Sequence, residues 1–358
     1  MQNRGFRLSA PKFRSRDHDN LYQRLLAQKD LYLARNSSKT KRLLIYKSLL
    51  FITMSAAGYA GIYLSTGLPL LLFSYLCFGG GLVLLGVNLG HDAAHGCATG
   101  NRQLDRRIFR LIFGIQGLNG YLWEIRHNHS HHPFPNVYGY DCDLETSRLF
   151  HLNKNVRKRW FHRYQHLYAP IVYSVFSLVS VFYLDLKIFY SKKLGNISFR
   201  PSAKDAISLW LFKLIHLAVY AGFPVIFAKT APGQIILSYL IMHLFLSVVI
   251  SFVFFISHHV EETSYSETTD NEVQHSWIET QVHATLDFYP ESRLAGFFFG
   301  GFNAHLAHHL FPSVSHVHYP GLTAIIRQEL GGTNLRYNTL SFRGAVRSHL
   351  RLLRKMAR

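Results

Sequence analysis

The sequence predicts an all-α integral membrane protein with four transmembrane helices and a cytoplasmic histidine-rich helical cap. Three observations support this fold class: long apolar segments, basic residues that gather between them, and histidines at helical spacing. The chain has 358 residues, 48% of them hydrophobic, and a formal net charge of +19. Because Lys and Arg lie beside the apolar segments, we expect them to face anionic lipid headgroups, and we expect no nucleic-acid partner.

The first segment, residues 1–42, is polar and rich in Arg and Lys. It has no apolar region of the kind that secretory signals carry, so we expect a basic cytoplasmic N-terminal segment before a membrane domain over residues 43–358. The cysteines Cys77, Cys97 and Cys142 have no CxxC spacing, and they predict reduced thiols rather than a disulfide framework.

Four apolar segments have about the 20 residues that a helix needs to cross a bilayer. The sequence STGLP joins the first two and KTAPGQ the last two, which predicts two antiparallel hairpins. Basic residues are dense before the first, between the second and third, and after the fourth. The positive-inside rule therefore places both termini and the middle section in the cytoplasm. The predicted spans are about residues 44–65, 68–89, 206–228 and 234–257.

Two further apolar segments, about residues 108–123 and 168–186, need not cross the membrane. The second is flanked by bases on both sides, so a crossing would leave one basic cluster outside. We interpret both as interfacial, the second alternatively as re-entrant. Within the spans, we expect Lys213 to snorkel toward the interface and His243 to be a hydrogen-bonded packing residue.

Histidines recur in three groups that lie just beyond the spans. His91 and His95 follow the second span at i, i+4 spacing, so they share one helical face, and Gly86 and Gly90 would admit a neighbouring helix. In "HNHSHHPFPN" (127–136), a helix ended by prolines would place His127 and His131 on one face. His132 lies further round the helix and would serve a second metal, whereas His129 points away.

The third group is "FNAHLAHHLFP" (302–312), in which His305, His308 and His309 have i, i+3, i+4 spacing. A ninth candidate lies in "SHHVEET" (257–263) at the end of the fourth span, where we favour His259 over His258. Imidazole is a neutral ligand that suits iron, zinc and copper. Eight histidines are too many for one ion with an open position, so the pattern predicts two metal ions rather than pH-sensing surface histidines.

The motifs "HDAAHG", "WEIRHNHSHHPFPNVYGYDCD" and "GGFNAHLAHHLFPSVSHVHYP" resemble the three histidine boxes of membrane fatty-acid desaturases, closest to the acyl-lipid and front-end (linoleoyl-type) group. The resemblance extends from about residue 38 to the C-terminus. It implies a non-haem enzyme that uses two iron ions and O₂ to introduce a double bond into an acyl chain. It also implies that Asp92 and Asn303 orient imidazoles. The implied iron ligands are His91, His95, His127, His131, His132, His259, His305, His308 and His309.

Departures from the family pattern bear on partners and substrate. His305 stands where desaturases fused to a cytochrome b5 usually have Gln, and no such haem motif is visible. The resemblance therefore implies a separate electron donor, of the ferredoxin or cytochrome b5 type. Residues 281–290, with His283 and Asp287, diverge from the family, which leaves open whether a lipid or an acyl thioester is the substrate. Candidates for holding its headgroup are Trp123, Arg126 and Trp277.

Two alternatives remain at the level of sequence. The same scaffold could hydroxylate or ketolate a lipid or carotenoid, because the boxes do not fix how the substrate is positioned. A metal transporter without catalysis should instead carry its ligands near the bilayer midplane on interrupted helices. The histidines here mostly follow the ends of the spans, which favours the enzyme.

Overall fold

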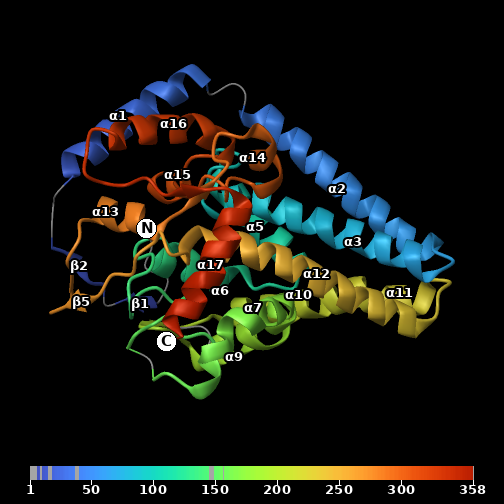
Figure 1. Cartoon of the computed structure of the whole chain (residues 1–358). Coiled ribbons are helices and arrows are strands. Elements are labelled where there is room, and N and C mark those ends of the chain that lie inside the picture. The colour runs from blue at the N-terminus through green and yellow to red at the C-terminus, as the bar shows by residue number, and fades with distance from the viewer. Residues whose placement is uncertain are drawn as a thin grey trace.

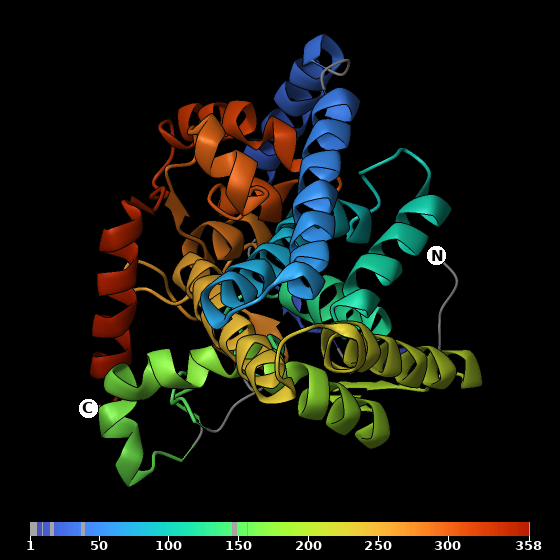
Figure 2. The same cartoon turned by 90° about the vertical axis from the view of Figure 1, so that its right-hand side faces the viewer.

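The computed structural model describes residues 6–8, 10–14, 18–36, 40–144, 149–155 and 157–357. These residues form a mainly helical protein, with long helices extending to one side and short helices gathered at the other (Figure 1). Figure 2 looks onto the side where the long helices end and turn. The all-α fold class is therefore confirmed.

Among the described residues, four helices are long and apolar enough to cross a membrane, as predicted. The first lies within α2 (Thr40–Leu64) and the fourth is α12 (Pro232–His258). The second and third are each interrupted by a π-helical turn but remain continuous. The four spans are Arg42–Leu64, Leu68–Ala94, Ala203–Phe227 and Pro232–His258.

The second span is longer than the sequence predicts. It consists of α3 (Leu68–Leu85), the π-turn η2 (Gly86–Gly90) and α4 (His91–Ala94), so the first histidine pair continues directly from the membrane helix. The third span consists of α10 (Ala203–Leu217), η6 (Ala218–Gly222) and α11 (Phe223–Phe227).

Helices α2 and α3 form a tight antiparallel hairpin, and α3 also packs against α12. Glycine allows the close approach: a Cβ atom on Gly58 would lie 2.7 Å from the carbonyl oxygen of Ser74, and one on Gly81 would lie 2.7 Å from that of Phe51. At both positions the obstacle is backbone, which cannot rotate away. Small residues therefore fix the spacing of the first two spans.

The apolar segment predicted at 168–186 forms two helical stretches, Trp160–Ser174 and Phe176–Ser191, bent by 65° at Val175. The bend suits either a broken span or a re-entrant loop, so our interfacial interpretation stays a prediction. The segment predicted at 108–123 is divided between α5 (Arg102–Ile115) and α6 (Gly120–Arg126). With 14 residues, α5 is too short to span a bilayer.

The remaining helices belong to the bent segment, to the cap and to the C-terminus. They are η3 (His127–His131), η4 (Trp160–Tyr164), α7 (Gln165–Ser174), α8 (Phe176–Val179), η5 (Ser180–Leu184), α9 (Asp185–Ser191), α13 (Trp277–Ala284), α14 (Arg293–Phe299), α15 (His305–Leu310), η7 (His316–His318), α16 (Tyr319–Leu330) and α17 (Phe342–Met356).

Short strands tie distant segments together in three small sheets, of order β1-β4-β3, β2-β6-β5 and β7-β8. Strand β2 runs parallel to β6 and β7 parallel to β8, whereas β1 is antiparallel to β4. The strands are β1 (Phe6–Leu8), β2 (Lys12–Phe13), β3 (Lys193–Leu194), β4 (Ile197–Phe199), β5 (Thr268–Thr269), β6 (Glu272–Val273), β7 (Asp287–Phe288) and β8 (Thr339–Leu340).

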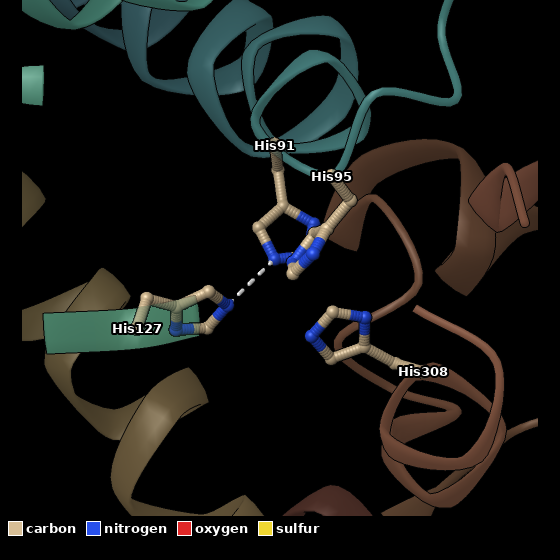
Figure 3. A group of neighbouring side chains, drawn as sticks. All are labelled: His91, His95, His127 and His308. Carbon is tan, nitrogen blue, oxygen red and sulfur yellow. Dashed lines mark hydrogen bonds between the residues drawn. The ribbon is translucent and has the colours of Figure 1, made fainter. Parts of the chain in front are cut away.

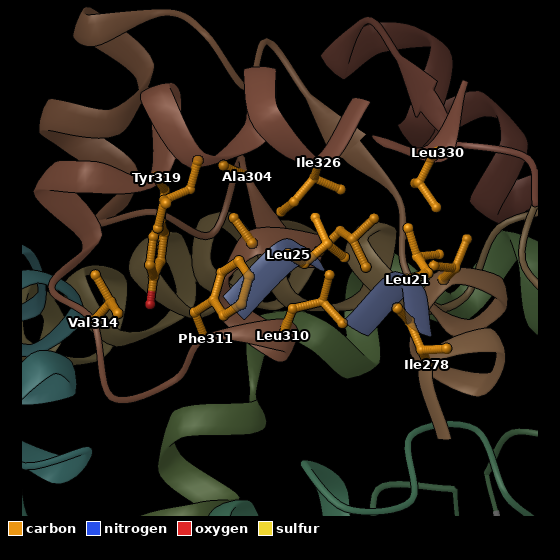
Figure 4. Close-up of a cluster of buried hydrophobic side chains, with 14 of the residues drawn as sticks. Leu21, Leu25, Ile278, Ala304, Leu310, Phe311, Val314, Tyr319, Ile326 and Leu330 are labelled. Atoms are coloured by element: carbon orange, nitrogen blue, oxygen red, sulfur yellow. The ribbon is translucent and has the colours of Figure 1, made fainter. Parts of the chain in front are cut away.

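The cap, which consists of α1 (Asp19–Asn36), α13, α15 and α16 with their connecting segments, has its own hydrophobic core. Helix α1 lies along α16 and inserts Leu21 and Leu25 among side chains of α13, α15 and α16 (Figure 4). Trp277, a candidate for headgroup binding, packs edge-on against Tyr22 in this core, with ring centroids 4.9 Å apart. The N-terminal helix thereby covers the segment that carries the third histidine group.

Lys213 does not snorkel as expected. Its Nζ atom lies 2.7 Å from Oδ2 of Asp185 and donates to the carbonyl oxygen of Gly117. The side chain is buried, because the bent segment 160–191 packs beside the third span and supplies the carboxylate. The expectation was wrong because Asp185 is 28 residues away in sequence, and nothing local predicts that the two meet.

Candidate metal centre

Eight histidines converge in two adjacent groups, each with four ring nitrogens within 4.8 Å of one another. In the first group, His91 and His95 extend from the end of the second span toward His127 and His308 (Figure 3). All three predicted clusters contribute to the two groups. The first group is His91, His95, His127 and His308, and the second is His131, His258, His305 and His309.

The π-turn η3 divides the second cluster between the groups. A π-helix bonds i to i+5, and the amide of His132 donates to the carbonyl of His127 at 3.0 Å. The π-turn thereby brings His132 beside His127, while the rings of His127 and His131 still stack on one another as predicted, with centroids 5.7 Å apart. His127 joins the first group and His131 the second.

His132 lies between the groups. Its Nε2 atom is 3.0 Å from Nε2 of His127, and its ring stacks on that of His309 with centroids 4.5 Å apart. The ring of His308 also lies 4.4 Å away. His132 can therefore reach toward either group, whereas His129 belongs to neither.

At the end of the fourth span, the structure brings His258 rather than His259 into the second group. Nε2 of His258 lies 3.0 Å from Nε2 of His131 and 2.6 Å from Nε2 of His305. The ring of His259 turns away and places its Nδ1 atom 3.1 Å from the Tyr265 hydroxyl. Residue spacing alone offers no means of deciding between two adjacent histidines at a helix end.

Hydrogen bonds on the outer side of the second group orient three of its four rings. Nδ1 of His258 donates to the carbonyl oxygen of Ala284 at 2.9 Å, and Nδ1 of His309 donates to Oε1 of Gln281 at 2.9 Å. Nδ1 of His131 lies 3.1 Å from Oδ2 of Asp141. With a proton on Nδ1, a ring of this kind presents its Nε2 lone pair to the interior of the group.

The imidazole nitrogens of these groups lie close together in a way that suits a bound cation. The Nε2 atoms of His131 and His258 approach to 3.0 Å, although neither carries a proton for the other to accept. Nε2 of His308 and Nε2 of His309 are buried without a hydrogen-bond partner among the described residues. Buried polar atoms are costly unless something satisfies them, and a metal ion would satisfy several at once.

The electrostatic environment keeps most of these rings neutral, as metal ligation requires. Burial lowers the pKa of His95 to about 4 and holds the pKa values of His127, His305, His308 and His309 well below the usual range. For His131 burial also lowers the pKa, but the charge and hydrogen bond of Asp141 together with the charge of Asp143 outweigh burial, and the net pKa is raised. Asp141 therefore makes His131 the most basic of the rings outside the spans.

The two residues expected to orient ligating imidazoles have partners outside the eight converging histidines. The Asp92 carboxylate lies 3.0 Å from Nδ1 of His316 and accepts from the Ser315 hydroxyl at 2.6 Å. Asn303 donates to the carbonyl oxygen of Tyr289 at 3.0 Å. Sequence reasoning missed the orienting groups that the structure does supply, Asp141 and Gln281. Asp141 could have been found, since it stands ten residues after His131 in the quoted "GYDCD" motif.

An elongated cavity of about 270 Å³ opens from both histidine groups into the membrane-spanning region. Near the histidines it is lined by Trp123 and Arg126, and Arg126 pairs with Asp143 at 2.5 Å. Further along it runs between α12, the third span and the bent segment, with mostly apolar walls. The cavity suits a long apolar chain that reaches the histidine groups from the bilayer side.

Fold and site together define an integral membrane protein that holds two buried imidazole groups at the end of an apolar cavity. A family model for fatty acid desaturases matches residues 65–341. The chain belongs to the fatty acid desaturase family, and it is accordingly an oxidoreductase of lipid metabolism.

Relatives over most of the chain are acyl-lipid desaturases. The chain is 27% identical over 289 residues to an sn-1 linoleoyl-lipid 6-desaturase of Arthrospira platensis, covering 80% of this chain and 78% of that protein. An enzyme of the same name from Synechocystis is 24% identical over 353 residues, covering 94% and 96%. Acyl-lipid (8-3)-desaturase B of Dictyostelium discoideum is 31% identical over 288 residues, covering 76% and 61%. These names support lipid desaturation.

Proposed function

We propose that this protein is an O₂-dependent non-haem di-iron desaturase that introduces a double bond into the acyl chain of a lipid or an acyl thioester. The observation that carries the proposal is the pair of four-histidine groups, each with ring nitrogens within 4.8 Å of one another, at the head of an apolar cavity. Each group offers enough imidazoles to hold one iron ion while leaving a position open.

One iron would be held by His91, His95, His127 and His308, and the other by His131, His258, His305 and His309. We assign His258 the role that the sequence suggested for His259, because of where the two rings lie. His132 would be an additional ligand of one of the two iron ions, since its ring contacts both groups. Asp141 and Gln281 would hold the rings of His131 and His309 in their ligating orientation.

The iron ions and O₂ would supply the oxidising power that side chains lack for breaking an unactivated C–H bond. Two hydrogens leave adjacent carbons, and together with two electrons and two protons from outside they reduce O₂ to two waters. The chain's own contribution is to exclude bulk water and to hold one pair of carbons against the histidine groups. The mostly apolar walls of the cavity support both roles.

The polar end of the substrate would lie near Arg126 and Trp123, which line the cavity beside the histidines. Trp277 would not bind the polar end of the substrate, because it packs in the core of the cap. The electrons would come from a separate donor of the ferredoxin or cytochrome b5 type. The basic segments around the spans support a cytoplasmic position for both termini and for the metal site.

Comparison of lipid extracts from an expressing and a non-expressing host tests the proposal. Mass spectrometry should find an acyl chain lighter by two hydrogens, formed only with O₂ present, and fragmentation should locate the double bond. The variant His308→Ala should abolish this product and lower the iron content of the purified protein. A product heavier by one oxygen would show a hydroxylase instead, and metal uptake without any new lipid would indicate a transporter.

A further inference from the structure

The cavity has a polar far end that an ordinary acyl chain does not need. Along α12, His243, Ser247 and Ser251 line it at i, i+4, i+8 spacing, on the same face as His258. Fifteen residues separate His243 from His258 and seven separate Ser251 from it, so at about 1.5 Å per residue the polar region extends from roughly 10 Å to roughly 22 Å from the second histidine group. Ser177 and Ser180 of the bent segment line the same region.

Several polar atoms in this region are buried without a partner among the described residues. They are Nε2 of His243, Oγ of Ser180 and Oγ of Ser251. His243 is 7% exposed and Ser251 1% exposed, and both residues lie in the middle part of a membrane span. Leaving such groups unpaired in an apolar surrounding is unfavourable, so the arrangement calls for a partner inside the cavity.

The His243 ring is held in place by a serine network. Its Nδ1 atom lies 2.8 Å from Oγ of Ser177, and Ser247 donates its hydroxyl to the same oxygen at 2.5 Å. The backbone amide of Ser177 in turn donates to Oγ of Ser247 at 3.0 Å. The network occupies Nδ1 and leaves Nε2 as the ring's unpaired polar atom.

His216, which also lines the cavity, provides a contrast. Its Nδ1 atom lies 3.3 Å from the carbonyl oxygen of Ile115, and its Nε2 atom lies 3.1 Å from the Tyr239 hydroxyl. Both nitrogens of His216 are therefore satisfied within the protein. The packing role expected for His243 fits His216 better, whereas His243 keeps one ring nitrogen for a ligand.

We propose that His243 forms a subsite for a hydroxyl on the distal part of the acyl substrate, and that Ser180 and Ser251 extend the polar wall of the cavity beside it. A hydroxyl both donates and accepts, so it pairs with Nε2 in either tautomer and also with a serine hydroxyl. This inference rests on the proposed desaturase function and narrows its substrate class. An unmodified methyl end would leave the same atoms unpaired, and sites built to bond a hydroxyl reject analogues that lack it.

The experiment feeds expressing cells equal amounts of two fatty acids of one chain length, one unmodified and one with a single distal hydroxyl. A panel places the hydroxyl at successive carbons of the distal half. Mass spectrometry measures the fraction of each chain that gains a double bond. We expect the hydroxylated chain to be preferred by about tenfold or more at one position in the panel.

Variants connect the preference to the subsite. His243→Leu should lose the preference while still desaturating the unmodified chain, and His243→Gln should keep part of it because the amide can pair with a hydroxyl. Ser238→Ala is the matched control: Ser238 lies on the same helix and its hydroxyl is also buried without a partner among the described residues, but it does not line the cavity. Its preference should equal that of the unaltered protein.

A second readout separates this inference from the desaturase function. Purified protein is mixed with each fatty acid in detergent, and the shift in unfolding temperature reports binding. Desaturation without preference for any hydroxylated chain overturns the subsite and leaves the desaturase intact. A hydroxyl-dependent thermal shift that His243→Leu abolishes, without any double bond formed, supports the subsite and overturns the desaturase. The absence of both effects overturns both.

Discussion

Nδ1 of His131 lies 3.1 Å from Oδ2 of Asp141, while Nε2 of the same ring lies 3.0 Å from Nε2 of His258. The carboxylate is fully buried and also accepts the backbone amide of Asn136 at 2.9 Å. It therefore holds the ring from behind and directs its lone pair into the second histidine group. Carboxylate–histidine pairs of this kind orient metal ligands and raise their basicity.

Asp141→Asn should weaken metal binding without removing a ligand. The amide can still accept a hydrogen bond from Nδ1, but it lacks the charge that makes His131 basic. We expect the loss of metal affinity or activity to be about 10- to 100-fold. Iron per folded chain and the yield of desaturated lipid are the measurements.

The exposed turn residue Asp270 offers the control for that substitution. Asp270→Asn makes the same chemical change at a position with φ of 53°, which asparagine tolerates. Both quantities should match those of the unaltered protein. Full iron content in Asp141→Asn would show that the carboxylate does not act on a ligand.

The adjacent pair His258 and His259 allows a matched comparison. Both are buried, but only His258 contributes to a four-histidine group. His258→Ala should lose iron and all desaturation, whereas His259→Ala should keep its iron because it removes a ring bonded to Tyr265. Both variants create a similar void, so iron content is compared per monodisperse folded protein. Retained iron in His258→Ala with loss in His259→Ala would restore the assignment made from sequence.

These positions show how far sequence reasoning reaches. The spans and three histidine clusters were predictable because hydropathy and helical spacing are local properties of the chain. The division of the clusters between the two groups was not predictable. It depends on the π-turn at 127–131, which brings His132 beside His127, and on which rings of the other two clusters face each histidine.

Long-range partners were the other limit. Asp92 and Asn303 stand beside candidate ligands in sequence, yet their side chains bond to Ser315 and Tyr289. Gln281, which holds His309, is 28 residues from it and belongs to α13. Tertiary packing determines which residue orients a ligand, so proximity in the sequence does not predict it.

The buried pair of Lys213 and Asp185 should stabilise the contact between the third span and the bent segment. Lys213→Met leaves a buried carboxylate without its partner, and such a change costs about 3–5 kcal/mol of folding free energy. We expect a lower unfolding temperature in detergent. The double variant Lys213→Met with Asp185→Asn should recover most of the loss, because no uncompensated charge remains. A double variant as unstable as the sum of both single variants would exclude this coupling.

Gly300 lies just before the segment with the third histidine cluster and packs against the π-turn that precedes the first cluster. A side chain at this position should disturb both. It follows α14 with φ of 58°, and a Cβ atom would lie 2.7 Å from the carbonyl carbon of Val87, in the π-turn before His91. Gly100 has φ of 82° with nothing within 4 Å of its Cβ position. Alanine at either position carries the penalty of a left-handed backbone, so the difference in stability between the two variants reports the clash alone.

We expect Gly300→Ala to be less stable than Gly100→Ala by about 1–3 kcal/mol and to hold less iron, since the backbone of the π-turn must move. Thermal unfolding and iron content measure the two effects, and equal stability of the variants would mean that the π-turn yields without cost.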